Sequence, residues 1–237
     1  MGVKGCVVIP CYREEGRIGA TVTAVSAHCS HVFVVDDGSG DRTAEEAASA
    51  GANVLRHETN RGKGEALNTG FAYAREQGFE FVITMDGDGQ HAPADIPEFL
   101  EAYKNLSAPV LVGTRMQNTA SMPLVRRATN RFMSWLLSRM MGQRVPDTQC
   151  GYRLYRTDVL TSMPSMSQHF AAESEILLDL AANGVRIGSV PITVIYGDEQ
   201  SKIHAFRDTV RFFSMLIRWK MNREKTHSWR WHDTCVR

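Results

Sequence analysis

The first half of the chain alternates between short apolar runs and segments with helical periodicity. Apolar runs of this length, bounded by turn residues, are typical of buried strands. The resulting order, β-α-β-α-β-α-β, predicts a mostly parallel sheet with helices on both faces. The predicted strands are residues 5–10, 32–35, 52–55 and 79–85, and the predicted helices are residues 16–29, 42–50 and 63–76.

The second half has a less regular pattern. The helix predicted at residues 173–183 is followed by Gly184, the residue favoured directly after a helix C-terminus. The other predictions are strands at 110–113 and 150–155, a strand region at 185–196 interrupted at Pro191, and helices at 124–141 and 206–221. We therefore predict an α/β domain over residues 1–205 and a basic amphipathic helix and tail over residues 206–237.

Composition narrows the class of protein. Hydrophobic residues make up 43% of the chain, which excludes a disordered protein, and the net charge of +1 excludes a strongly basic nucleic-acid binder. The five cysteines are odd in number and lack metal-ligand spacing, which favours free thiols in a reducing compartment. With no signal peptide and no apolar run of about 20 residues, we expect a cytoplasmic protein.

Two carboxylates, Asp86 and Asp88, follow the fourth predicted strand, with Gly87 between them. The residues that follow parallel strands gather at one sheet edge, where ligands bind. Oxygen ligands at this spacing suit Mg²⁺ or Mn²⁺ bridging a diphosphate, and Gly87 permits close approach of that ligand. The alternative is an acidic turn without a ligand, which Asp and Gly also favour.

The second predicted strand ends in two adjacent carboxylates, Asp36 and Asp37. Buried carboxylates are costly unless they accept hydrogen bonds, so these two are candidates for binding the base or ribose of a nucleotide. The alternative is that they cap the next helix, although Asp41 can supply that cap instead.

Several motifs occur in a fixed order between residues 7 and 202. They are VVIPCYREE, VVDDGSGDRT, NRGKGEALNTG, MDGDGQH, VGTR, DTQCGYRLYR and a late VPI followed by Ser201-Lys202. In this order the chain resembles family 2 glycosyltransferases, and more narrowly the branch that contains dolichyl-phosphate mannose and glucose synthases. The resemblance implies a GT-A fold and inverting transfer of a sugar from a UDP- or GDP-sugar to a polyprenyl phosphate.

The resemblance also implies which residues bind the donor. The nucleotide would lie near Pro10, Tyr12, Glu14 and Asp37, and the metal and diphosphate near Asp86, Asp88 and Gln90. Gln90 makes the acidic motif closer to the polyprenyl-phosphate branch than a bare DxD, and Asp88 is the candidate catalytic residue through the metal.

On the acceptor side, Arg115 and Arg127 match positions that bind phosphate in that branch, and arginine suits bidentate phosphate recognition. Lys202 resembles a residue of the loop that closes over donor and acceptor. The alternatives are a solvated helix charge for Arg127 and an ordinary loop lysine for Lys202.

A catalytic base is needed for a sugar hydroxyl but hardly for a phosphate, which is already anionic. Glu175 matches the family's acidic position, and Glu173 lies about half a helical turn away, so at most one of them should face the site. Either could instead be an N-terminal helix charge. Lys63 could touch the diphosphate, or could belong to a glycine-rich loop that caps the next helix.

Two helices have apolar arcs broader than a soluble surface helix needs. In residues 124–141 the polar face is narrow, and in residues 206–221 Arg207, Arg211 and Arg218 line one side. We expect contact with an anionic membrane surface on the cytoplasmic face. The alternative is packing on the core or in a homodimer.

Two other functions share these motifs. The acceptor could be the hydroxyl of a saccharide or glycolipid, or the chain could bind a nucleotide sugar without catalysis. An intact pair of Asp86 and Asp88 argues against the noncatalytic alternative.

Overall fold

The computed structural model describes residues 4–115, 124–160, 172–193, 195, 210 and 212–221. The chain divides into two compact units, residues 1–199 and 200–237. In the second unit, residues 212–221 are helical. All named elements below belong to the first unit.

Seven strands form one sheet in the order β3-β2-β1-β4-β6-β5-β7. Strands β1, β2, β3 and β4 are parallel, β6 is antiparallel to both of its neighbours, and β5 and β7 are parallel to each other. The strands are β1 (Gly5–Cys11), β2 (Val32–Asp36), β3 (Asn53–Arg56), β4 (Phe81–Thr84), β5 (Val110–Thr114), β6 (Arg153–Arg156) and β7 (Ile187–Pro191).

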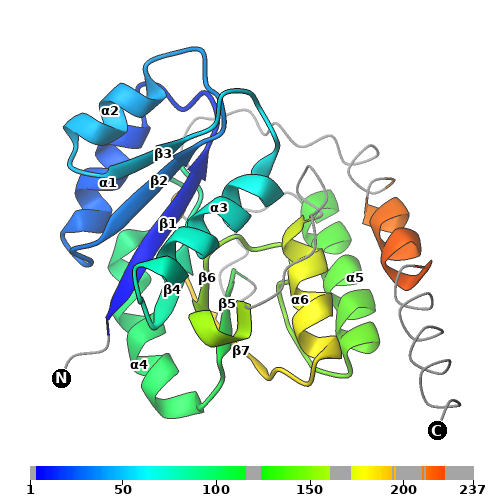
Figure 1. Ribbon diagram of the computed structural model, residues 1–237. Coiled ribbons are helices and arrows are strands. Elements are labelled where there is room, and N and C mark those ends of the chain that lie inside the picture. The colour runs from blue at the N-terminus through cyan, green and yellow to red at the C-terminus, as the bar shows by residue number, and fades with distance from the viewer. Residues whose placement is uncertain are drawn as a thin grey trace, which may run out of the picture. The chain divides into compact units, whose positions relative to one another are not determined.

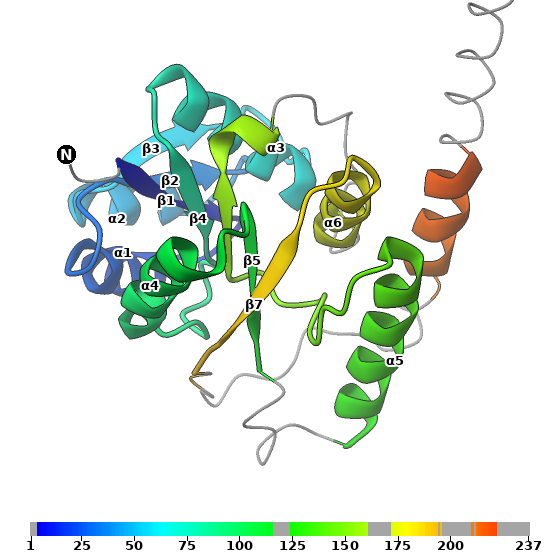
Figure 2. The same ribbon diagram turned by 90° about the horizontal axis from the view of Figure 1, so that it is seen from below.

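Helices cover both faces of this sheet (Figures 1 and 2). Figure 2 shows α1 and α4 on one face, and α3 and α6 on the other, with α5 beside α6. The helices are α1 (Ile18–Ser26), α2 (Thr43–Ser49), α3 (Lys63–Glu76), α4 (Ile96–Leu106), α5 (Leu124–Met141) and α6 (Ala172–Ala182), with short 3₁₀ turns at Pro93–Asp95 and Thr157–Leu160.

The core lies between the sheet and these helices. The central strands β1, β2 and β4 are almost fully buried apolar runs, as expected for parallel strands covered on both faces. Helix α3 approaches the sheet closely at Gly70, where a Cβ atom would lie 2.4 Å from a methyl group of Val8. A glycine is therefore required where α3 crosses β1 and β2, because a Cβ atom would also approach Val35.

The predicted α/β class and the helices on both faces are confirmed. The strand predicted at 150–155 begins only at Arg153, because residues 150–152 approach the acidic edge before the strand starts. The strand region at 185–196 is the short β7, and helix α4 was not predicted. Among the described residues, no helix is long and apolar enough to cross a membrane.

Candidate active site

The carboxyl ends of β1, β2, β4 and β5 meet at one edge of the sheet. Cys11 pairs with Asp36 at the ends of β1 and β2. Strand β5 runs in the same direction as β4 because β6 is antiparallel to both. The segments after β4 and β5 therefore start from the same edge, as the strand-end argument predicts.

Lys63 joins three elements at this edge. It is the first residue of α3, and its ammonium lies 2.5 Å from Asp86 Oδ1 and 2.8 Å from Glu173 Oε1. Asp86 follows β4, and Glu173 is in the first turn of α6. One lysine thus bridges a candidate metal ligand, Asp86, and a buried glutamate, Glu173, that are far apart in sequence.

The charges in this cluster depend on one another. Burial opposes the charged form of Lys63, but the carboxylates of Asp86 and Glu173 outweigh it and raise the pKa of Lys63. Burial likewise opposes ionisation of Asp86, but Lys63, with a smaller contribution from His91, lowers the pKa of Asp86. At neutral pH Lys63 is therefore an ammonium, and Asp86 is an ionised carboxylate.

Asp88 differs from Asp86 in its surroundings. Burial and the nearby charge of Asp86 raise the pKa of Asp88, while the hydrogen bond that Asp88 Oδ1 accepts from the Gln90 backbone N–H, at 3.0 Å, works against that rise. Asp88 thus carries a charge that the folded protein disfavours. Such a carboxylate is suited to receiving a cation.

Gly151 lies between the carboxylates of Asp86 and Glu173. A Cβ atom on Gly151 would lie 2.8 Å from Glu173 Oε1 and 2.9 Å from Asp86 Oδ2. Any side chain here would displace the two carboxylates. The glycine of the DTQCGYRLYR motif therefore keeps open the space next to the acidic cluster.

Arg153 holds the surroundings of Gly151 in place. Its fully buried guanidinium donates to the backbone oxygens of Cys150 at 2.7 Å, Thr148 at 2.9 Å and Glu173 at 2.6 Å. This arginine ties the loop before β6 to the first turn of α6. We did not single out Arg153 from the sequence, although its place within a recognisable motif was a signal.

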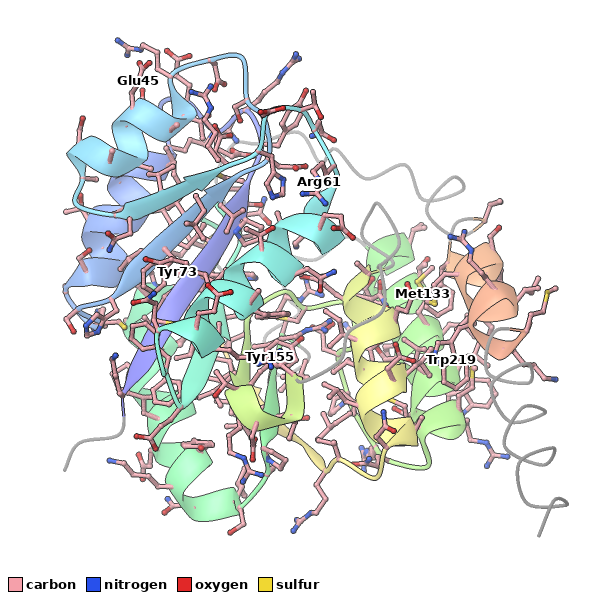
Figure 3. All side chains as sticks on the ribbon, in the orientation of Figure 1. Glu45, Arg61, Tyr73, Met133, Tyr155 and Trp219 are labelled. Carbon is pink, nitrogen blue, oxygen red and sulfur yellow. The ribbon has the colours of Figure 1, made fainter. Side chains whose placement is uncertain are left out.

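Asp36 and Asp37 accept hydrogen bonds within the protein. Asp36 accepts the Ser39 N–H at 3.0 Å and lies 3.1 Å from Arg56 Nε. Asp37 accepts the backbone N–H groups of the loop before Lys63, from Arg61 at 2.9 Å and Gly62 at 2.7 Å. Figure 3 shows Arg61 at the start of α3.

His57 completes the set of donors to Asp37. Its Nδ1 lies 2.7 Å from Asp37 Oδ1, and its Nε2 lies 2.9 Å from the Thr69 hydroxyl. The carboxylate of Asp37 thus fixes the loop that positions Lys63. Asp41 Oδ1 accepts the Thr43 N–H at 3.1 Å in the turn before α2. The N-cap residue of α2 is Arg42, which makes no side-chain cap hydrogen bond, so the expected cap by Asp41 is not found.

Arg115 is engaged by a residue that the sequence did not single out. Its Nε and Nη2 donate to the two oxygens of Asp147 at 2.7 and 2.8 Å, and its backbone N–H also faces Asp147. Asp147 is completely buried. The guanidinium fork is therefore occupied by a carboxylate, and a phosphate could reach only the remaining donors.

The other candidates for nucleotide binding surround the end of β1. Pro10 is buried in the strand, Tyr12 is exposed beside Arg13, and Glu14 pairs with Arg17 at 3.0 Å. Gly87 is buried, and a Cβ atom on it would lie 3.1 Å from the Cβ of Cys11. The acidic turn thus packs directly on the end of β1.

The structure describes two of the three remaining candidates, Glu175 and Arg127. Glu175 is buried in the first turn of α6, but Glu173 is the glutamate that meets Lys63. The geometry therefore favours Glu173 over Glu175, and a catalytic role for Glu175 stays a prediction. Arg127 is half-buried in α5, and Lys202 lies outside the described residues.

The acidic turn fits a divalent cation of the Mg²⁺ type. Within the described part of the chain, no group of three or more His, Cys, Asp or Glu side chains could hold a metal alone. Mg²⁺ usually takes one or two carboxylates and completes its shell with water and substrate phosphates. Asp86 and Asp88 supply such a pair, Gln90 adds an amide nearby, and Lys63 places a positive charge against Asp86.

The family described as glycosyl transferase family 2 matches residues 6–163, more than half of the chain. The chain belongs to this family.

Two curated relatives of this glycosyltransferase act on lipid phosphates, according to their names. The UDP-N-acetylglucosamine–dolichyl-phosphate N-acetylglucosaminyltransferase of Methanococcus voltae is 32% identical over 213 residues, covering 80% of this chain and 85% of that protein. The undecaprenyl-phosphate mannosyltransferase of Micrococcus luteus is 32% identical over 203 residues, covering 79% and 82%.

A solved structure supports the fold. Glucosyl-3-phosphoglycerate synthase from Mycobacterium tuberculosis, in complex with Mn²⁺, UDP-glucose and phosphoglyceric acid, matches with a TM-score of 0.70 and 21% identity. The match covers 92% of this chain and 80% of that chain. The GT-A-type fold that the motifs imply is thereby confirmed.

Proposed function

We propose that this family 2 glycosyltransferase transfers a sugar, with inversion, from a nucleotide-diphosphate sugar to a polyprenyl-phosphate type of lipid. The observation that carries the proposal is the acidic turn of Asp86 and Asp88 at the edge where β1, β2 and β4 end. The curated relatives extend this from sugar transfer in general to lipid-phosphate acceptors.

The donor is assigned to the edge of the sheet near β1, β2 and β4. The nucleotide would lie over Tyr12 and Glu14, next to the fixed pair of Asp36 and Asp37, and its diphosphate would lie at the acidic turn. Asp86, Asp88 and Gln90 would hold Mg²⁺ or Mn²⁺ there. The metal would neutralise the charge that develops on the leaving nucleoside diphosphate.

A phosphate acceptor is consistent with the charges of the site. Its oxygen is anionic at neutral pH and needs little deprotonation. The glutamate that reaches the site, Glu173, is already paired with the Lys63 ammonium at 2.8 Å. Because the Lys63 ammonium holds this carboxylate, the arrangement favours a phosphate acceptor over a sugar hydroxyl, which would need a base.

The outward face of α5 supports attachment to a membrane surface. Phe132 and Trp135 are 51% and 58% exposed, and their rings stack with centroids 6.0 Å apart. Val125 and Met140 are also exposed on this helix, which contains four arginines and no acidic residue. Exposed aromatic residues on a basic helix suit an anionic lipid interface.

Sugar transfer is tested with Mn²⁺, labelled UDP- and GDP-sugars, and polyprenyl phosphate, followed by extraction into organic solvent. We expect label in the organic phase with one of the donors, and loss of that label in Asp88→Asn. Release of nucleotide with label on a saccharide or glycolipid hydroxyl would support the second acceptor class. Absence of turnover with every donor would contradict the proposed enzyme.

Membrane contact is tested by tryptophan fluorescence with vesicles of anionic and of neutral lipid. We expect anionic vesicles to shift the emission to shorter wavelength, and Trp135→Tyr to reduce the shift, because the other three tryptophans lie in the segment 206–237. The segment 206–237, from which we also predict membrane binding, lies largely outside the described residues. A truncation before residue 206 that binds vesicles as well as the full chain would contradict that part and leave the assignment to α5.

A further inference from the structure

The Lys63 ammonium contacts a carboxylate that the proposed function assigns to the metal ion. It lies 2.5 Å from Asp86 Oδ1, and Asp86 is one of the two carboxylates of the acidic turn. A divalent cation on Asp86 and an ammonium at that distance repel each other strongly in a partly buried site. Cation binding therefore requires Lys63 to move relative to Asp86 or to share it at a high electrostatic cost.

Glu173 gives Lys63 a second charged partner. Its Oε1 lies 2.8 Å from the Lys63 ammonium, and its side chain is buried. An ammonium that leaves Asp86 can therefore stay on Glu173 without being left uncompensated in the protein interior. The backbone oxygen of Glu173 is fixed by Arg153 at 2.6 Å, which holds this second partner in place.

We propose that Lys63 is a displaceable internal counter-ion that balances Asp86 in the metal-free protein and is retained on Glu173 when a divalent cation takes Asp86. This inference rests on the proposed function because it needs a cation at the acidic turn. It assigns Glu173 the role of a positioning residue that acts through Lys63, which is different from a catalytic base.

Gly151 supplies the room that this exchange needs. It lies between the two carboxylates, and a Cβ atom there would approach oxygens of both within 3.0 Å. With a glycine at this position, neither carboxylate is pushed out of reach of the ammonium by a neighbouring Cβ atom. The loop of Gly151 is itself held by Arg153, so the space is a fixed feature of the fold.

The exchange links the metal to the diphosphate. Without nucleotide, a cation must compete with Lys63 for Asp86, and its affinity is reduced. A bound diphosphate adds negative charge beside the displaced ammonium and lowers the cost of the exchange. We therefore expect the cation and the nucleoside diphosphate to bind with positive coupling, and we expect this coupling to depend on Lys63.

The experiment measures Mn²⁺ affinity by electron paramagnetic resonance, with and without UDP or GDP, for the full-length chain and variants. Without nucleotide, Lys63→Met should bind Mn²⁺ about tenfold more tightly because the competing charge is gone. Glu173→Gln should bind Mn²⁺ about tenfold more weakly, because the Lys63 ammonium can then no longer be retained by Glu173 and competes more strongly for Asp86. The gain in Mn²⁺ affinity on adding nucleotide should be smaller in Lys63→Met than in the natural chain.

A double variant separates the exchange from a general effect of charge. If Lys63 carries the effect of Glu173, then Glu173→Gln in the Lys63→Met background should change Mn²⁺ affinity by less than about threefold. Additive effects of the two substitutions would show a simple field effect and overturn the proposal. Lys104→Met, at an exposed position on α4, is the control for net charge and should leave the affinity unchanged.

Failure of this inference and failure of the proposed function give different results. Mn²⁺ that does not bind the natural chain even with nucleotide would contradict the metal site itself, and the inference with it. Mn²⁺ that binds the natural chain, without the opposite shifts, would contradict the inference alone. If Lys63→Met does not fold, Lys63→Arg replaces it: a guanidinium that holds both carboxylates should weaken Mn²⁺ binding, and an unchanged affinity would count against the exchange.

Discussion

The acidic edge of the sheet and the outward face of α5 differ in how their side chains are paired and buried. At the edge, charged groups are drawn inward and bound to one another, as Lys63 is to Asp86 and Glu173. On α5, the apolar rings of Phe132 and Trp135 remain exposed to solvent. Internal pairing fixes the geometry of a site before its ligand binds, whereas exposed apolar surface is costly in water and indicates a partner.

The largest effect that we expect concerns the acidic edge. Asp88→Asn should lower sugar transfer by about 100-fold or more, because a group that stabilises developing charge is lost. Its thermal stability should not fall, because burial and Asp86 raise the pKa of Asp88, so its charge is disfavoured in the folded state at neutral pH. Product assays and thermal melts check both statements.

Asp86→Asn is the matched comparison for that variant. It should also lose activity, but it should melt at a lower temperature than the natural chain, because it removes an ionised carboxylate that Lys63 stabilises. This stabilisation lowers the pKa of Asp86. The ionised form of Asp86 stabilises the fold above its unfolded pKa, and this contribution is lost as pH falls through its lower folded pKa. Equal melting temperatures for the two variants would contradict the distinction between the two aspartates.

The next effect concerns the pair of Arg115 and Asp147. Asp147→Ala should lower the free energy of unfolding by about 3 kcal/mol, because it leaves a largely buried guanidinium without its carboxylate. Asp158→Ala breaks the exposed pair with Arg156 and should cost less than about 1 kcal/mol. Chemical denaturation measures both, and a similar small loss in the two variants would mean that Arg115 is not held by Asp147.

A smaller effect is expected at Gly151. Gly151→Ala should weaken Mn²⁺ binding in the presence of nucleotide about tenfold, since its Cβ would press on the carboxylates of Asp86 and Glu173. Gly19→Ala, in α1, is the control, because a Cβ there meets its nearest atom at 3.7 Å. Titration with Mn²⁺ that gave the same affinity for both variants would show that the carboxylates can adjust.

A last prediction concerns the thiols behind the acidic edge and tests the packing of the edge without affecting catalysis. Burial raises the pKa of Cys11, and it raises the pKa of Cys150 to about 12. At pH 8 both should be alkylated at least about 100-fold more slowly in the folded protein than in denaturant, because the thiolate is the reactive form. Mass spectrometry of the labelled peptides measures the rates, and rapid labelling of Cys11 would show that the end of β1 opens.

The local sequence predicted that the acidic residues after the strands lie at one edge of the sheet, for a physical reason. In a parallel sheet of β-α-β units, the residues after successive strands must meet at one edge, so Asp36, Asp37, Asp86 and Asp88 could be placed from the order of the strands alone. Periodicity did not reveal α4, and β6 begins later than its apolar pattern suggested.

Contacts between distant segments could not be obtained in this way. The sequence left Glu173 and Glu175 open, because the direction of a side chain in the first turn of α6 depends on how that helix packs. It also gave Arg115 no partner, although Asp147 lies 32 positions away and holds it by two side-chain hydrogen bonds.

By itself the sequence determined the fold class, the family motifs and the place of the acidic turn after β4, because these depend on short-range patterns. Only the tertiary structure decided which charges are already paired. It placed Lys63 between Asp86 and Glu173, and it turned the aromatic residues of α5 outward. The reason is that electrostatic partners and exposed faces are set by the packing of elements from distant parts of the chain, which no local pattern records.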